Sequence, residues 1–314
     1  MTILFAAPEF DADAWRRRIA AVAGGRAIAV EGSDAYDPAA IRYALVWQPP
    51  AGLLAALPNL EAIFNLGAGV DRLMADTTLP DVPIVRVVDP NLTGRMTEWV
   101  TLQVLTHQRS ALAFLARQKA HEWVEEASPA ASAVRVGIMG LGELGRDAVE
   151  VLVRLGFQVA GWSRSARTVP GIETHSGAAG LDAFLARTDI LVVLLPLTDE
   201  TRGILNAGLF AKLARDGALG GPVLINAGRG GLQVEADILA ALDAGVLKAA
   251  SLDVFGTEPL PATSPLWERD DVVITPHVAA ISDPSALCRG IVAQIEAHER
   301  GEELKHVVDR ALGY

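Results

Sequence analysis

The sequence predicts an α/β protein built from two doubly wound, Rossmann-like domains with parallel sheets. Short apolar runs alternate with helical stretches along most of the chain, which is typical of parallel strands covered by helices. The later runs are almost continuously apolar, as expected for strands buried on both faces. The length of 314 residues corresponds to about two ordinary domains.

The candidate strands form two series along the chain. The first series comprises residues 2–6, 27–31, 43–47, 62–66 and 83–87. The second comprises residues 134–139, 157–162, 189–195, 222–227, 249–254 and 271–275. Between the series, residues 97–123 contain no Pro or Gly and predict one long helix. Residues 284–300 predict a final amphipathic helix, and the short tail 306–314 must pack on a domain already built. A tail that returns to the first series would make the second an insertion.

The composition excludes several classes of protein. With 27 Lys and Arg against 38 Asp and Glu, the net charge is −11, which disfavours binding to nucleic acid or anionic membranes. A single cysteine, Cys288, excludes an intramolecular disulfide and multi-cysteine metal sites, so no metal is expected. No apolar run reaches the roughly 18 residues of a membrane span, and the start lacks a signal-peptide pattern. We therefore expect a cytoplasmic protein.

A glycine motif opens the second series. Residues 134–145 run from a strand into Gly140, Gly142 and Gly145, and residues 143–155 predict an amphipathic helix. In this context the first glycine permits a tight turn, the second lets a pyrophosphate approach the backbone, and the third lets helix and strand pack closely. The motif predicts dinucleotide binding. The alternative is a purely structural turn between strand and helix.

The segment after the next strand favours NADP over NAD. An NAD site normally offers a carboxylate about 20 residues beyond the glycine motif. Here the chain instead has Trp162, Ser163, Arg164, Ser165 and Arg167. Guanidinium and hydroxyl groups suit a 2′-phosphate because they donate charge-assisted hydrogen bonds to it. The alternative is an ordinary basic loop that is exposed to solvent and binds no phosphate.

A second glycine loop follows a strand of the first series. Gly67 and Gly69 flank Ala68, but Arg72 stands where a dinucleotide motif would need its third glycine. Backbone N–H groups of such a loop can bind a carboxylate. A tight strand-to-helix turn is equally consistent with these residues.

Three polar side chains lie at or beyond the ends of late strands. Arg229, Glu258 and His277 each follow a candidate strand of the second series. Open α/β sheets bind ligands at this edge, where the three groups could bind an anion, orient a base and transfer a proton. Each residue alone has an ordinary explanation as a surface charge, a turn residue or a strand-end histidine.

Taken together, these motifs resemble the D-isomer-specific 2-hydroxyacid dehydrogenases over nearly the whole chain. Within that family, the glyoxylate/hydroxypyruvate reductase A branch is the most similar. The stretches that carry the resemblance are YALVWQPP, LGAGVDRL, GRMTEWV, WSRS, INAGRG, LDVFGTEPLP, SPLW and TPHVAAIS. Gly228 departs from many relatives, which have a slightly larger residue there.

The resemblance implies a division of the chain and a partner. Residues 1–98 and 287–314 would form the substrate domain, and residues 99–286 an NADP-binding Rossmann domain inserted between them. A homodimer would form through the nucleotide domains.

The resemblance also implies roles for individual residues. Arg229 would hold the substrate carboxylate and carbonyl oxygen, His277 would be the acid/base, and Glu258 would hydrogen-bond to His277. Asp253 would approach the nicotinamide. The substrate-binding residues would be Trp47, Leu66, Gly67, Ala68, Gly69, Arg229 and His277. The cofactor-binding residues would be Gly140, Gly142, Glu143, Leu144, Gly145, Trp162, Ser163, Arg164, Ser165, Arg167, Leu195, Pro196, Thr201, Asn226, Ala227, Gly228, Asp253, His277 and Ala279.

The expected function is the NADPH-dependent reduction of small 2-keto acids, glyoxylate and hydroxypyruvate, to glycolate and D-glycerate. One alternative is a reductase for larger 2-keto acids. The volume of the substrate pocket would distinguish it from a reductase of small acids. Another is a non-catalytic NAD(P)-sensing protein, which the retained Arg229, Glu258 and His277 argue against. Cys288 and the other histidines lie in stretches without evident partners and are interpreted as structural.

Overall fold

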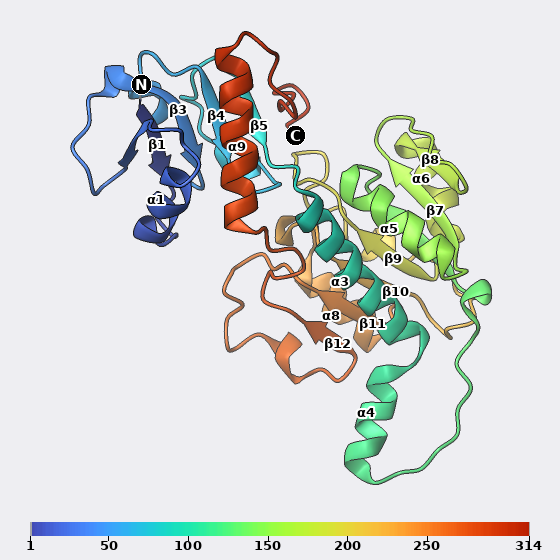
Figure 1. Ribbon diagram of the computed structural model, residues 1–314. Coiled ribbons are helices and arrows are strands. Elements are labelled where there is room, and N and C mark those ends of the chain that lie inside the picture. Colours follow the sequence, from blue (N-terminus) through green and yellow to red (C-terminus); the bar gives the residue numbers. More distant parts are fainter. Residues whose placement is uncertain (1, 314) are drawn as a thin grey trace. The chain divides into compact units, whose positions relative to one another are not determined.

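The computed structural model describes residues 2–313 and has the predicted α/β fold with two parallel sheets. The chain divides into two compact units (Figure 1). Unit 1 comprises Met1–Leu92 and Ser282–Tyr314, and unit 2 comprises Thr93–Ile281. The two points at which the chain passes from one unit to the other lie a few residues before the boundaries expected from the sequence. The roles of the two units remain predictions.

The sheet of unit 1 contains the five predicted strands of the first series, in the order β2-β1-β3-β4-β5. The strands are β1 (Thr2–Ala6), β2 (Ala27–Val30), β3 (Ile41–Val46), β4 (Ala62–Asn65) and β5 (Ile84–Arg86). Every neighbouring pair is parallel. The order reverses between β1 and β3, and open α/β sheets bind ligands outside the carboxyl ends of the strands at such a point.

Helices cover the unit 1 sheet, and apolar clusters lie on its two faces. The helical segments are α1 (Ala12–Ala20), η1 (Pro38–Ala40), η2 (Leu54–Ala56), α2 (Asp71–Met74) and α9 (Pro284–Glu299). α1 and α9 pack together on one face through buried residues such as Trp15, Ile19, Leu287 and Ile291. The final helix predicted over 284–300 is confirmed, with Asp283 as its N-cap.

The C-terminal tail packs on the unit 1 sheet, as its length required. Val307 forms an antiparallel bridge with Val85, and the N–H of Val308 donates to the carbonyl of Ile84 at 2.8 Å. The guanidinium of Arg310 donates to the carbonyl of Val82 at 2.7 Å. The tail therefore extends the edge of the sheet at β5.

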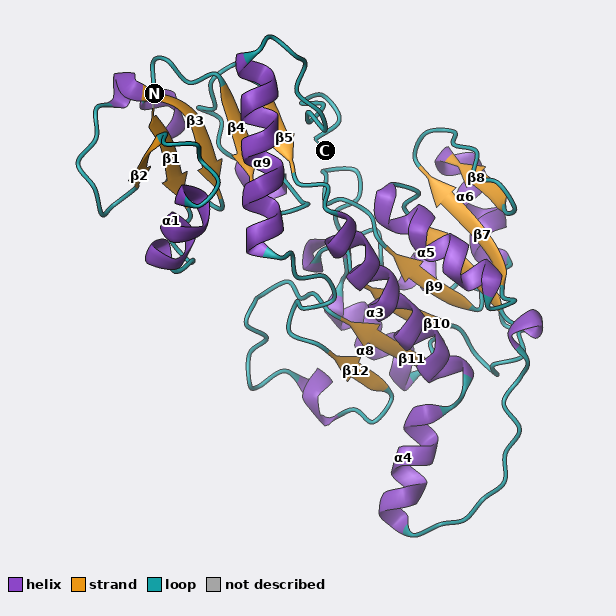
Figure 2. Ribbon diagram, viewed as in Figure 1, coloured by secondary structure: helices purple, strands orange, loops and turns teal. Residues whose placement is uncertain are grey.

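The sheet of unit 2 has the Rossmann strand order with one strand added at the β12 end, β12-β11-β10-β9-β6-β7-β8 (Figure 2). The strands are β6 (Arg135–Met139), β7 (Gln158–Ser163), β8 (Glu173–Ser176), β9 (Ile190–Val193), β10 (Val223–Asn226), β11 (Ala249–Leu252) and β12 (Val272–Ile274). The order reverses between β6 and β9. β8 was not predicted, because its sequence ETHS has no apolar run and it lies at the sheet edge.

Helical segments flank the unit 2 sheet, apart from α4, which extends away from it (Figure 1), and large apolar clusters fill both faces of the sheet. They are α3 (Pro90–Gln108), α4 (Ala111–Ala120), η3 (Ala131–Ala133), α5 (Glu143–Arg154), α6 (Gly177–Ala186), α7 (Ala207–Phe210), η4 (Gly230–Leu232), α8 (Glu235–Asp243) and η5 (Pro265–Glu268). α5 begins at Glu143, within the glycine motif, as predicted, and contains Gly145 in its first turn.

The prediction of one helix over 97–123 was wrong. α3 ends at Gln108, and Ser110 has a left-handed φ of +53°, so the helical hydrogen bonds are interrupted before α4 begins. The helix also starts earlier, because Asp89 accepts a hydrogen bond from the N–H of Asn91 and Pro90 occupies the first turn. The break was invisible to periodicity because it contains neither Gly nor Pro.

Of the remaining histidines, His175 on β8 lies 3.3 Å from the carboxylate of Glu173, and two others form contacts between elements. His107 on α3 lies 2.8 Å from the hydroxyl of Ser251 on β11, and that hydroxyl donates to Gln103 at 2.9 Å. His298 on α9 lies 3.0 Å from the hydroxyl of Tyr43. Both contacts join elements within one unit, which fits a structural role. Among residues 2–313, no helix could span a membrane, and no group of three His, Cys, Asp or Glu side chains could hold a metal ion.

We predict that His107 makes stability pH-dependent. Burial, with a smaller contribution from Lys248, lowers the pKa of His107 from 6.5 to about 4. The unfolded chain therefore binds a proton at His107 more readily than the folded chain does. The free energy of unfolding is unaffected above pH 6.5 and falls by up to about 3 kcal/mol as the pH falls towards 4. Urea unfolding of His107→Gln should show a flatter pH dependence over this range. The exposed control His121→Asn should behave like wild type, and an unchanged profile in His107→Gln would contradict the assignment.

Candidate active site

The glycine motif forms a tight turn at the carboxyl end of β6. Gly140 has a φ of +111°, and its N–H donates to the carbonyl of Trp162 at 2.9 Å. A Cβ atom on Gly145 would lie 1.9 Å from the carbonyl oxygen of Gly140, so only glycine fits there. A Cβ atom on Gly142 would meet no described atom within 4 Å. The turn thus leaves open backbone at the N-terminus of α5, which fits a pyrophosphate.

The segment after β7 lies beside this turn. The hydroxyl of Ser163 donates to the carbonyl of Ser165 at 2.8 Å, which fixes a tight bend. Arg167 reaches back to the carbonyl of Leu141 within the glycine turn, at 3.5 Å. Arg164 forms an ion pair with Glu200. The predicted arginines and serines are therefore gathered at the position where the fold binds an adenosine ribose.

The loop after β9 borders the other side of the turn. The N–H of Leu194 donates to Met139 at 2.8 Å, joining this loop to the end of β6. Thr201 is buried, and its hydroxyl donates to the carbonyl of Pro196 and accepts from the N–H of Thr198, both at 2.8 Å. Thr201 therefore shapes the loop internally.

The loop that presents Arg229 is held by a buried amide pair. The Nδ2 of Asn226 donates to the Oε1 of Gln233 at 2.9 Å, while its Oδ1 accepts from the N–H of Gly228 at 3.0 Å. The Gly228 site is crowded, since a Cβ atom there would lie 2.7 Å from Leu232. Arg229 donates to the carbonyl of Gly228 at 2.8 Å. Gln233 was not predicted, because nothing in its local sequence marks it.

The Arg229 loop is locked against the loop that follows β11. Gln233 donates through Nε2 to the carbonyl of Val254 at 3.0 Å. Gly230 lies so close to Phe255 that a Cβ atom would be 1.9 Å from its carbonyl oxygen. The N–H of Asp253 donates to the carbonyl of Asn226 at 3.0 Å. Two loops that carry predicted site residues therefore behave as one block.

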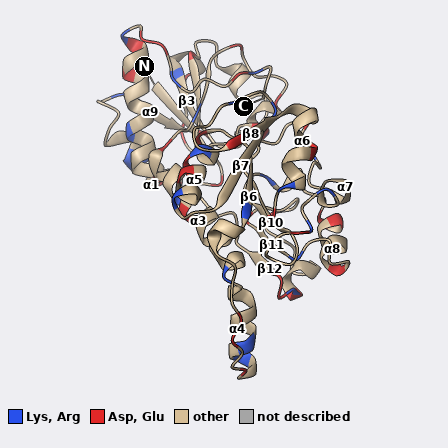
Figure 3. Ribbon diagram, turned by 90° about the vertical axis from the view of Figure 1, so that its right-hand side faces the viewer, with Lys and Arg blue, Asp and Glu red and all other residues tan. Residues whose placement is uncertain are grey.

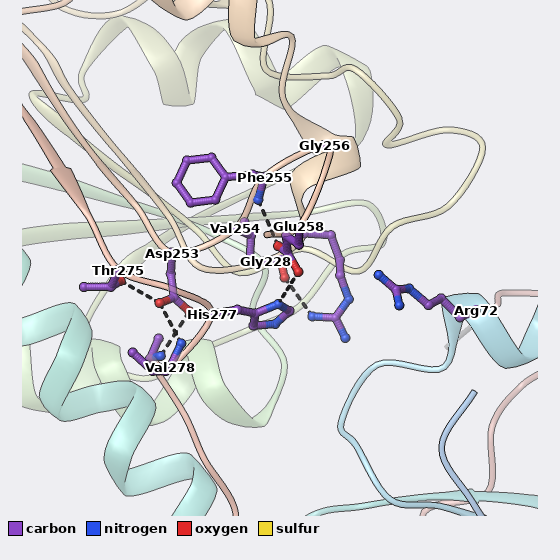
Figure 4. Close-up of polar contacts among 12 residues, drawn as sticks. Arg72, Gly228, Asp253, Val254, Phe255, Gly256, Glu258, Thr275, His277 and Val278 are labelled. Carbon is purple, nitrogen blue, oxygen red and sulfur yellow. Dashed lines mark hydrogen bonds and ion pairs between the residues drawn. The ribbon is translucent and has the colours of Figure 1, made fainter. Parts of the chain in front are cut away.

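His277 and Glu258 form the predicted pair (Figure 4). The Nδ1 of His277 lies 2.9 Å from the Oε2 of Glu258, whose Oε1 accepts from the N–H of Phe255 at 2.9 Å. The pairing assigns Nε2 as the ring nitrogen that can exchange a proton with a ligand. The His277 side chain is 44% exposed and Glu258 25%, so the imidazole is accessible while its carboxylate partner is shielded.

Asp253 fixes the segment that contains His277 (Figure 4). Its carboxylate accepts from the hydroxyl of Thr275 at 2.6 Å and from the N–H groups of Val278 at 2.9 Å and Ala279 at 3.0 Å. The N–H of His277 also donates to the Asp253 carbonyl at 2.8 Å. The buried Asp253 thus positions His277, and its predicted contact with the cofactor stays a prediction.

In unit 1, the second glycine loop packs under Trp47. A Cβ atom on Gly67 would lie 2.1 Å from the Trp47 ring, so glycine is required there. The buried Asn65 donates to the carbonyls of Gly67 at 2.8 Å and Gly69 at 3.0 Å. These carbonyls are held inward, which suits the predicted use of the loop N–H groups as donors. The N–H of Leu66 is not one of them, since it donates to Val46 at 2.9 Å.

The strand order, the open glycine turn and the histidine–carboxylate pair define a dinucleotide-binding α/β protein with an acid/base site. Comparison with known families gives the particular one. The family described as "D-isomer specific 2-hydroxyacid dehydrogenase, NAD binding domain" matches residues 101–279. The chain belongs to this family of D-isomer specific 2-hydroxyacid dehydrogenases, as its motifs indicated.

Relatives of known name match over the full length. The chain is 39% identical to "Glyoxylate/hydroxypyruvate reductase A" of Serratia proteamaculans, covering 100% of both chains. It is 40% identical to the protein of the same name from Citrobacter koseri, again over 100% of both.

Solved structures are similar over the same length. The NADPH-dependent glyoxylate/hydroxypyruvate reductase of Sinorhizobium meliloti, in complex with NADP and sulfate, is 50% identical with a TM-score of 0.94 and covers 100% of this chain and 99% of its own. A probable 2-hydroxyacid dehydrogenase of Rhizobium etli, in complex with NADP, HEPES and L(+)-tartaric acid, is 48% identical with a TM-score of 0.95 at the same coverage.

Proposed function

We propose that this protein is an NADPH-dependent reductase of glyoxylate and hydroxypyruvate that produces glycolate and D-glycerate. The observation that carries the proposal is the His277–Glu258 pair, fixed in one block with the Arg229 loop beside an open dinucleotide turn. The names of the full-length relatives support the same substrates.

Each site residue has a chemical role in this reaction. When bound, NADPH supplies the hydride to the carbonyl carbon. His277 gives a proton from Nε2 to the carbonyl oxygen, and Glu258 orients the ring through its contact with Nδ1. Arg229 binds the substrate carboxylate and the carbonyl oxygen, where negative charge grows in the transition state.

We propose that NADPH is preferred over NADH. Ser163, Arg164 and Arg167 gather beside the glycine turn, and the segment from Gly161 to Arg167 offers no carboxylate for a 2′-hydroxyl. Guanidinium groups suit a 2′-phosphate. Similar structures were solved with NADP or NADPH bound, which supports this preference.

We further propose that unit 1 is the substrate unit and unit 2 the nucleotide unit. The loop that contains Gly67 and Gly69 would bind the substrate carboxylate through its backbone N–H groups. Trp47 would line the pocket and limit the size of the substrate, which favours small acids over branched or aromatic ones. The retained Arg229, Glu258 and His277 favour catalysis over a purely sensing role.

We propose that the protein is located in the cytoplasm. Cys288 is a free cysteine buried in unit 1, and burial raises the pKa of its thiol to about 11. The thiol is therefore protonated and inert at neutral pH. A chain without disulfides suits a reducing compartment.

Initial rates with four acids and two cofactors test the proposed function. Glyoxylate and hydroxypyruvate should be reduced faster than pyruvate and phenylpyruvate, and faster with NADPH than with NADH. Arg229→Ala should lower kcat/KM by about 100- to 1,000-fold because it removes charge stabilisation at the carbonyl oxygen. Arg154→Ala, on the exposed last turn of α5, is the matched control. Wild-type kcat/KM in Arg229→Ala on every acid would refute the site, and NADPH binding without turnover would favour the sensing role.

We propose a homodimer formed through unit 2. α4 has no buried residue, and Figures 1 and 3 show it extending away from the sheet of unit 2. Trp123, just beyond it, is 93% exposed, and Leu115 is 55% exposed. Large exposed apolar side chains of this kind mark an interaction surface. A second copy of this chain is the occupant that the family resemblance implies.

Light scattering after size exclusion tests the dimer. Wild type should have twice the mass of one chain, and Leu115→Asp combined with Trp123→Asp should be monomeric, because two charges cannot be buried unpaired at an interface. Leu155→Asp, at an apolar site 43% exposed after α5, should remain dimeric. A monomeric wild type, or a dimeric double variant, would contradict the assignment of this surface.

A further inference from the structure

One ion pair crosses the predicted adenosine site of unit 2. Arg164 follows β7, and Glu200 lies in the loop that follows β9. In the sheet, β6 lies between these two strands. The Arg164–Glu200 pair therefore spans the carboxyl end of β6, where the glycine turn lies.

The backbone on both sides of this pair is held by hydrogen bonds, whereas the two side chains are partly exposed to solvent. Ser163 is buried and bends the segment before Arg164, while the buried Thr201 fixes the loop next to Glu200. The Glu200 side chain is 66% exposed and that of Arg164 is 35% exposed. The Glu200 side chain can therefore leave the pair for solvent without disturbing the backbone of either loop.

The pair has a chemical consequence for a 2′-phosphate. A guanidinium offers the same N–H groups to a carboxylate and to a phosphate. A 2′-phosphate that reaches Arg164 must displace the Glu200 carboxylate or lie beside it and be repelled. A 2′-hydroxyl carries no charge and meets neither cost.

We propose that Glu200 is a specificity-determining residue that occupies the place of the cofactor 2′-phosphate on Arg164. Glu200 lowers the affinity for NADPH but not that for NADH, and so limits the preference of the protein for NADPH over NADH. This inference rests on the proposed cofactor of the same site. It identifies a residue outside the glycine motif and the basic segment that sets the strength of that preference.

Calorimetric binding to the full-length protein tests the proposal without turnover. The probes are 2′,5′-ADP and 5′-AMP, which differ by one phosphate, together with NADPH and NADH. Glu200→Gln should raise the affinity for 2′,5′-ADP and NADPH by about two- to fivefold, the range of a partly exposed ion pair, and change that for 5′-AMP and NADH by less than about twofold. Asp199→Asn removes the adjacent exposed carboxylate and should change all four affinities by less than about twofold.

A second background shows whether the effect acts through Arg164. In Arg164→Ala, adding Glu200→Gln should no longer change the affinity for 2′,5′-ADP selectively, because the shared partner is absent. Three results would overturn the proposal: an unchanged or weaker affinity of Glu200→Gln for 2′,5′-ADP, an equal gain for 5′-AMP, or an equal gain in Asp199→Asn. Failure of the proposed cofactor is recognised separately, since wild type itself would then bind 5′-AMP as tightly as 2′,5′-ADP.

Discussion

The buried carboxylate of Asp253 is the constraint on which the catalytic geometry depends. A charge removed from water is costly unless hydrogen bonds satisfy it, and here Thr275, Val278 and Ala279 all donate to it. The chain after β12 is therefore fixed on both sides of His277. Within this segment His277 adopts a φ of +54°, a conformation uncommon for residues other than glycine. The backbone conformation of this segment therefore sets the direction of the imidazole without a bound ligand.

A second set of contacts places the other polar groups relative to that histidine. Asn226 and Gln233 join the loops after β10 and β11, and Gly230 lets their backbones touch. Because these strands are parallel neighbours, their carboxyl ends lie at one edge, and the loops need only short contacts to become rigid. Preorganisation of this kind is what allows a fixed dipole or charge to stabilise a transition state.

Local patterns in the sequence predicted much of the fold and part of the site. Buried strands such as β6 and β10 have continuous apolar runs, and Gly145 of the dinucleotide turn is required by its contact with Gly140, five residues earlier in the chain. The edge strand β8 and the break at Ser110 have no such pattern. The roles of Asn65, Gln233 and Asp253 depend on hydrogen bonds that form only once the chain has folded, so composition and spacing could not reveal them.

The most direct test of this account is the kcat for glyoxylate reduction by Asp253→Asn at saturating NADPH, in protein whose affinity for NADPH has been measured. An asparagine has one side-chain oxygen that accepts, whereas its amide nitrogen only donates. It therefore cannot accept all three hydrogen bonds, and the segment that contains His277 should shift. The account predicts a fall in kcat of about 100-fold with little change in NADPH affinity, since misplacing a catalytic group by about 1 Å has an effect of that size. A kcat within twofold of wild type would contradict it.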